Sequence, residues 1–167
     1  MTDKKHKPMP PEPETISEAR TAAEKRERYR KFSRIPFEEA GEGIFVHFSW
    51  DGIGKLEGLT EGKKIPGETW FGTVERLLLS GDVAALRQCL DVSLKIEGPE
   101  GKPIPAVAVD LDDPGFAITD AVTPILNALA YITYRKSYEE MIAEATAARE
   151  AAVEEARKAW QEQKAAS

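Results

Sequence analysis

The chain has 167 residues and a formal net charge of −6, and 41% of its residues are hydrophobic, which suits one domain of ordinary size with tails. The acidic balance argues against nucleic-acid partners, which require a basic face. The chain has a single cysteine, no signal-peptide core and no apolar run of about 18 residues, which argues against export and membrane spanning. We therefore expect a soluble cytoplasmic protein.

The first 34 residues predict two segments outside the folded body. Residues 1–14 hold four prolines among charged side chains, so we expect a disordered tail. Residues 15–34 open with a capping-box match at 15–18 and continue with helix formers to about Phe32, which predicts a solvated helical arm. Its basic cluster is typical of a solvated helix face, and the alternative is an arm for an acidic partner surface. The cluster consists of Lys25, Arg26, Arg28, Arg30 and Lys31.

Residues 44–48 (IFVHF) are the best strand candidate, because they are apolar and rich in β-branched and aromatic side chains. The weaker run 106–111 (AVAVDL), which ends at a turn signal, is the predicted partner strand. Between them, Ser49 is expected to cap a short helix with an apolar residue at every third position. Those positions are Trp50, Ile53, Leu56 and Leu59.

Residues 69–96 have the strongest pattern in the chain and predict two apolar-striped helices joined by a turn. Gly81 can adopt the left-handed conformation that ends a helix, and Asp82 can cap the next one. The two stripes supply most of the predicted core, namely Trp70, Phe71, Val74, Leu77, Leu78, Leu86 and Leu90.

Two further helices are predicted in the C-terminal part. The first is strongly apolar, is capped by Thr119 or Asp120, and adds Ile125 and Leu129 to the core. The second follows a capping box at 137–140 and is rich in Ala and Glu to about Gln163. Its inner stripe buries little apolar area, so we expect this helix to project beyond the body. The stripe consists of Ile142, Ala145, Ala152, Ala156 and Ala159.

The predicted fold class is therefore mainly α: a small helical domain with one minor β element, a disordered N-terminus and a long C-terminal helix. The predicted boundaries are a tail at 1–14, an arm at 15–34, a core domain at 35–136 and a projecting helix at 137–167.

No residue pattern indicates catalysis or metal binding. Asp110, Asp112 and Asp113 lack the further acidic positions of an EF-hand loop, so turn and cap roles are favoured. His47 has no cysteine or second histidine nearby, and Cys89 lies on an apolar helix face without a histidine partner. We therefore expect no enzymatic activity, no cofactor and no metal.

The tryptophans divide into two groups. Trp50 and Trp70 are expected in the core, because a small domain needs their area for its hydrophobic interior, and the alternative is that they are binding hot spots. Trp160 stands on an otherwise small-residue helix, where it is either a contact anchor or an exposed surface residue.

Three segments together resemble the small tail proteins of phages and gene transfer agents. They are residues 48–57 (FSWDGIGKLE), 74–86 (VERLLLSGDVAAL) and 118–129 (ITDAVTPILNAL), within a likeness that covers roughly 43–140. The resemblance implies a tail assembly chaperone that binds the tape-measure protein and guides tail-tube subunits around it. The resemblance also includes tail-tube proteins of the virion, although this sequence has few candidate strands for the wall of a tube. A general cytoplasmic helical adaptor, unrelated to phages, is the alternative from another class.

The partner is expected to bind the projecting helix, because the body must use most of its apolar surface for its own core. A tape-measure helix would lie along residues 145–160, where small side chains allow close approach and the acidic flank favours a basic partner. The predicted contact residues are Ala145, Ala152, Glu154, Ala156 and Trp160.

Overall fold

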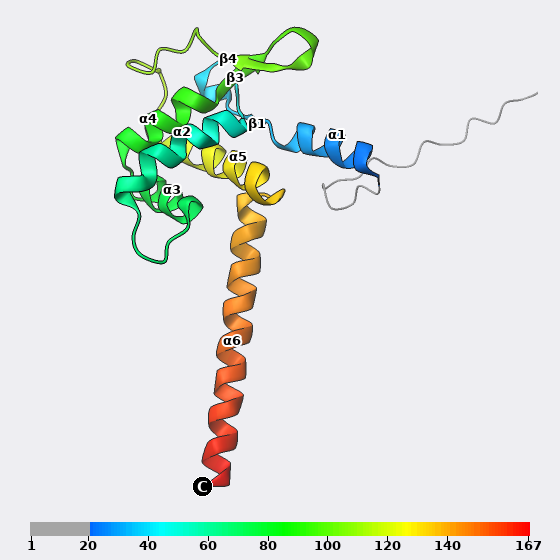
Figure 1. The fold of residues 1–167 in the computed structure, drawn as a ribbon, viewed down its shortest axis with the longest axis vertical. Coiled ribbons are helices and arrows are strands. Elements are labelled where there is room, and N and C mark those ends of the chain that lie inside the picture. The colour runs from blue at the N-terminus through cyan, green and yellow to red at the C-terminus, as the bar shows by residue number, and fades with distance from the viewer. Residues whose placement is uncertain (1–20) are drawn as a thin grey trace, which may run out of the picture.

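The computed structural model describes residues 21–167, and within this range it has six α-helices and a four-stranded sheet. Helices α2 to α5 and the sheet form the body, from which α1 (Ala22–Phe32) and α6 (Tyr138–Ala166) extend in different directions (Figure 1). The predicted mainly α fold is confirmed. The predicted tail at 1–14 and the predicted helix start at Thr15 lie outside the described residues.

The sheet is antiparallel, with the strands in chain order: β1 (Ile35–Pro36), β2 (Phe45–Val46), β3 (Leu94–Glu97) and β4 (Pro103–Pro105). The sequence predicted that residues 44–48 pair with 106–111, and this pairing is wrong. β2 lies between β1 and β3, while β4 ends at Pro105 and turns follow it. The Ala106 amide still donates to the Leu94 carbonyl at 3.1 Å, after which the chain turns at Val107 and Ala108.

The helical hairpin consists of α3 (Trp70–Leu79) and α4 (Val83–Ser93). Gly81 has a φ of +76° at the turn, and Asp82 caps α4 by accepting a 3.0 Å hydrogen bond from the Ala85 amide. The prediction that α4 reaches Ile96 is wrong, because the chain leaves the helix at Leu94 and becomes β3. There the apolar residues change from helical spacing to alternation with Lys95 and Glu97.

The core lies where α2 (Trp50–Thr60), the hairpin and α5 (Val122–Tyr134) meet one face of the sheet. α5 follows a 3₁₀ turn at Ile118–Ala121 and has no side-chain cap, so the predicted caps Thr119 and Asp120 do not form. Of the residues predicted for the core, all are buried except Trp70, which is partly buried against the cluster. The buried ones are Phe71, Val74, Leu77, Leu78, Leu86, Leu90, Ile125 and Leu129.

The arm α1 begins at Ala22, and Thr21 and Glu24 form a capping box at its start. Most of its residues are exposed, as predicted for a solvated arm, but its C-terminal end is attached to α5. Phe32 stacks on Tyr131 with ring centroids 6.0 Å apart, and the Arg135 guanidinium lies over the Tyr29 ring. The solvated description therefore holds for one face of α1 only.

Candidate protein-interaction site

The first residue of α6, Tyr138, is held to the body by two hydrogen bonds, and a cap forms beside it at Ser137. Ser137 caps the helix by accepting from the Glu140 amide, and the Tyr138 amide donates to Asn127 Oδ1 at 3.0 Å. The Tyr138 hydroxyl donates to Glu75 Oε2 on α3 at 2.6 Å. Burial and the Glu75 carboxylate both raise the pKa of Tyr138, so the hydroxyl keeps its proton and the bond persists. These contacts fix where α6 leaves the body.

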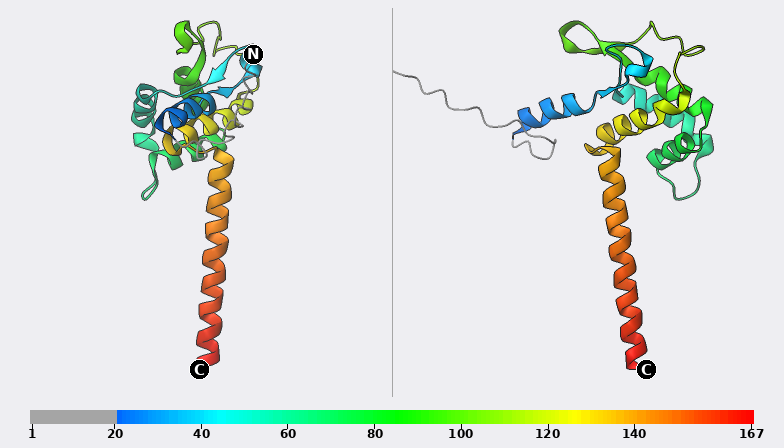
Figure 2. Two further views of the ribbon diagram at one scale, coloured as in Figure 1. Left: turned by 90° about the vertical axis from the view of Figure 1, so that its right-hand side faces the viewer. Right: turned by 180° about the vertical axis from the view of Figure 1, so that it is seen from behind.

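Beyond this attachment α6 stands alone in solvent. Met141 is half-buried, whereas every residue from 142 to 167 is exposed. The helix has 29 residues and is therefore about 43 Å long, and no other described part of the chain lies alongside its outer half (Figures 1 and 2). Beyond Met141 the helix packs against no part of the core, so its helicity there depends on its alanine-rich composition.

One face of α6 carries the apolar side chains that the sequence singled out. We call this face the α6 stripe, and it consists of Ile142, Ala145, Ala152, Ala156, Ala159 and Trp160. Trp160 is 60% exposed and Ile142 is 45% exposed, and Val153 at the edge of the stripe is 63% exposed. Glu154 lies on the opposite face, where it accepts a 2.8 Å hydrogen bond from Arg157. Of the predicted contact residues, Glu154 therefore does not share the stripe.

A second candidate surface lies on the body around Trp50, which sequence reasoning placed in the core. That expectation is wrong, because the Trp50 side chain is 88% exposed while Leu56 on the same helix is 2% exposed. A spacing of three residues drifts by about 60° per step around a helix, so the first and third members of the pattern face different directions. The side chain of Leu59 lies outside the described part of the molecule.

Trp50 borders a groove of about 340 Å³ between α2, α3 and α5. Its lining is mainly apolar and includes Trp70, with Glu57 as the charged member. The other lining residues are Ile53, Gly54, Ile132 and Thr133. A large exposed indole beside an apolar groove is the kind of surface that partner side chains fill.

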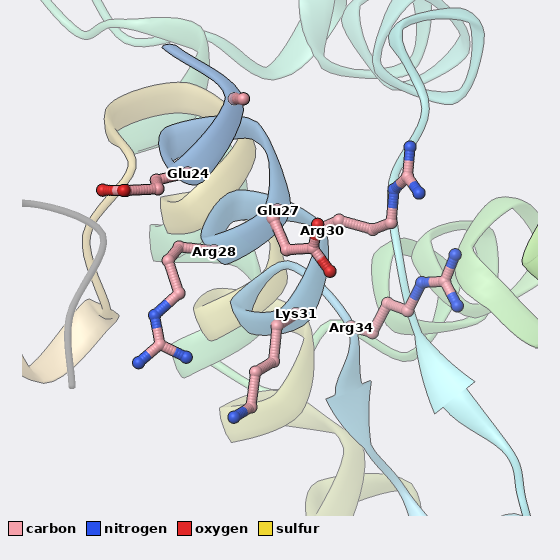
Figure 3. A pocket seen from close by; sticks show the side chains of 7 residues that line it. Glu24, Glu27, Arg28, Arg30, Lys31 and Arg34 are labelled. Carbon is pink, nitrogen blue, oxygen red and sulfur yellow. The ribbon is translucent and has the colours of Figure 1, made fainter. Parts of the chain in front are cut away.

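The basic residues of α1 border a wider hollow of about 600 Å³ (Figure 3). Two acidic side chains, Glu24 and Glu27, lie on the same helix, so the lining carries charges of both signs. Arg34 turns toward the sheet, where it donates to the Gly101 carbonyl and lies over the Phe45 ring. The hollow is thus a mixed-charge surface and does not form the basic face that nucleic acid requires.

The residues considered for chemistry have structural roles. Asp110 Oδ1 accepts from the Asp112 amide at 2.9 Å, and the Asp112 carboxylate pairs with Arg87, as expected for a turn. Burial raises the pKa of Cys89 to about 12, so its thiol is protonated at neutral pH. Burial lowers the pKa of His47, whose Nδ1 lies 3.3 Å from the Ser33 carbonyl. Among residues 21–167, no group of three potential metal ligands occurs.

No protein-family model, curated protein or solved structure matches this sequence. In the part of the chain described by the structure, none of the helices combines the length and apolar character needed to cross a bilayer. The residues and surfaces themselves therefore carry the functional argument.

Proposed function

We propose that the protein is a tail assembly chaperone of a phage or gene transfer agent, which acts in the cytoplasm of the bacterial host. Its partners would be the tape-measure protein and the tail-tube subunits assembled around it. It would act by binding alone, without catalysis, cofactor or metal. The resemblance of residues 48–57, 74–86 and 118–129 to small tail proteins supports the identity of these partners.

The observation that carries the proposal is the exposed length of α6. A tape-measure protein is expected to be long and helical, and a 29-residue helix with an apolar face offers it a parallel or antiparallel track. Small side chains at Ala145, Ala152 and Ala156 allow two helix axes to approach closely, so that many weak dispersion contacts form. The Trp160 indole supplies the one large anchor near the outer end.

Two other functions remain as alternatives. A tail-tube subunit needs an extensive sheet to close a ring, and the strands described here are only two to four residues long. A general helical adaptor would use the same exposed helix, and gene order separates it from the chaperone. Flanking tail-tube and tape-measure genes would support the chaperone, and their absence would favour the adaptor.

Co-purification with the tape-measure protein of the same gene cluster tests the proposal. The full chain and a chain that ends at Ala143 would each be co-expressed with that protein, and thermal unfolding would check that the shortened body is folded. We expect the full chain to retain the tape-measure protein and the shortened chain to lose it. Loss of binding in a Trp50→Ala variant of the full chain, with binding retained by the shortened chain, would move the site to the Trp50 groove. Absence of any complex would refute the proposal.

A further inference from the structure

The α6 stripe leaves apolar area in water that the described chain does not cover. Ile142, Val153 and Trp160 are large apolar residues that are 45%, 63% and 60% exposed, and they lie on or beside the stripe over most of the helix length. Isolated exposed apolar residues are ordinary, but an apolar face of this length on a projecting helix, which Arg149 interrupts near its middle, indicates a helical partner. The charges beside the stripe indicate which partner fits.

The charges along one flank of the stripe change sign halfway along α6. Helical periodicity places Glu139 and Glu150 on this flank in the first half, and Arg157 and Lys164 on it in the second half. In a parallel pair of these helices, this flank would face the opposite flank of the second helix, so Glu139 would meet Glu144 and Glu150 would meet Glu155. Those two contacts are repulsive, and only the contact of Arg157 with Glu162 would be attractive. In an antiparallel pair, Glu150 faces Arg157 of the second helix and Glu139 faces Lys164, and twofold symmetry gives each pair twice.

The same alignment brings large residues opposite small ones. When Glu150 and Glu139 face their basic partners, Trp160 lies opposite Ala145, and Ala152 and Val153 meet their own copies at the twofold axis. Alternation of large and small side chains lets two helices interlock without voids. Charge and size therefore select one and the same register.

In this register the second helix would end near the base of α6. A hollow of about 350 Å³ lies at the base of α6, lined by Tyr134, Lys136, Met141, Glu144 and Ala145. The last turns of the second helix, beyond Trp160, would run beside it. The opposite flank brings Glu162 of the second helix near Glu144, but Glu144 is paired with Lys136 at 2.7 Å, which offsets that repulsion.

From these relationships we propose that α6 pairs antiparallel with α6 of a second copy of this chain, in the register that places Trp160 opposite Ala145. The second copy occupies the α6 stripe when no other helical partner is bound. A tape-measure helix would then compete for the same stripe. The pairing itself requires no phage component and can be tested on the purified protein alone. If that test shows no pairing, the proposed function is not refuted.

The first test measures the mass of the purified full chain in solution across the micromolar range. We expect a dimer of twice the 18.5 kDa chain mass, in equilibrium with monomer. Arg157→Glu should weaken the dimer by about tenfold, because it creates two like-charge contacts around the axis. Adding Glu150→Arg to that variant should restore it. The control is Lys158→Glu, which makes the same charge change one residue away on the outer face and should leave the dimer unchanged.

A second test determines the direction of the pair by disulfide cross-linking in the full chain. The native Cys89 is buried and does not interfere. Ala152→Cys should cross-link two copies on oxidation, because these positions meet at the twofold axis. Glu139→Cys should not, because in the antiparallel register the two positions are on the order of 40 Å apart. A monomeric protein, cross-linking of both variants, or equal weakening by Arg157→Glu and Lys158→Glu would overturn the proposal.

Discussion

The Tyr138 hydroxyl donates a 2.6 Å hydrogen bond to the Glu75 carboxylate and thereby joins the first residue of α6 to the middle of α3. The two residues are 63 positions apart in the sequence, and each belongs to a separately predicted helix. Because the acceptor is charged, this bond is stronger than a neutral one. The direction in which α6 leaves the body depends on this contact.

Tyr138→Phe should therefore lower the free energy of unfolding by about 1–2 kcal/mol, since it removes the hydroxyl and leaves the Glu75 carboxylate without this donor. Chemical denaturation at neutral pH measures the change. Tyr134→Phe is the matched control, because its ring packs edge-on against Phe71 and its side chain is 45% exposed. Equal effects of the two substitutions would contradict the role assigned to the hydroxyl.

The ionisation of Glu68 should make the unfolding free energy depend on pH. Hydrogen bonds from Arg76 and Thr73 lower the pKa of Glu68 from 4.5 to about 2, with Arg76 as the largest cause. The unfolded state therefore binds more protons than the folded state in this range, and stability falls as the pH drops from about 4.5 to about 2. Glu68→Gln should flatten this part of the profile of unfolding free energy against pH. An unchanged slope in the variant would refute the assignment.

Leu129 tests the position of the core. It is 0% exposed at the centre of α5, so Leu129→Ala should cost about 3 kcal/mol through lost burial and the cavity left behind. Leu79→Ala is the matched control, because Leu79 on α3 is 61% exposed. The control should change the unfolding free energy by less than about 0.5 kcal/mol. Similar losses for both variants would show that the core has been misplaced.

Cys89 should be inert in the native protein. Its side chain is 1% exposed and burial raises its pKa to about 12, so almost no thiolate forms at neutral pH. A thiol reagent such as Ellman's reagent should label the native chain much more slowly than the denatured chain. In the denatured chain one thiol per chain should react. Fast labelling of the folded protein would contradict the burial of this residue.

Trp160 should contribute to binding of the tape-measure protein. Trp160→Ala is expected to weaken that complex by about 1–2 kcal/mol, as for a moderate anchor residue at an interface. The affinity would be measured with this protein dilute enough to be monomeric, so that self-association does not compete. Trp50→Ala, which removes an even more exposed indole from the body, should leave the affinity unchanged.

The sequence predicted the helices well because their signals are local. The Gly81 turn, the Asp82 cap and the Ser137 cap each act within a few residues, and the structure contains all three. The apolar stripes of α3 and α4 were equally predictable, because both helices bury one face against the same core. Long-range partners such as Glu75 and Tyr138 have no such local signal.

The sheet was harder to predict because its strands are two to four residues long. A period of two cannot be recognised in Ile35–Pro36 alone. β3 follows α4 without a turn signal, so the sequence pattern predicts a longer helix there. The prediction that Trp50 lies in the core fails for a different reason. A spacing of three approximates the helical period over one step, but the error accumulates until Trp50 and Leu56 face different sides.

Hydrogen exchange along the full chain, with and without the tape-measure protein, tests the central claim most directly. Residues 142–160 are exposed and should exchange readily in the dilute monomer, since a solvent-exposed helix opens locally. We predict that the tape-measure protein slows exchange mainly between Ala145 and Trp160, with little change around Trp50. Protection confined to the Trp50 groove, or no protection anywhere in the chain, would contradict the claim that α6 is the partner-binding helix.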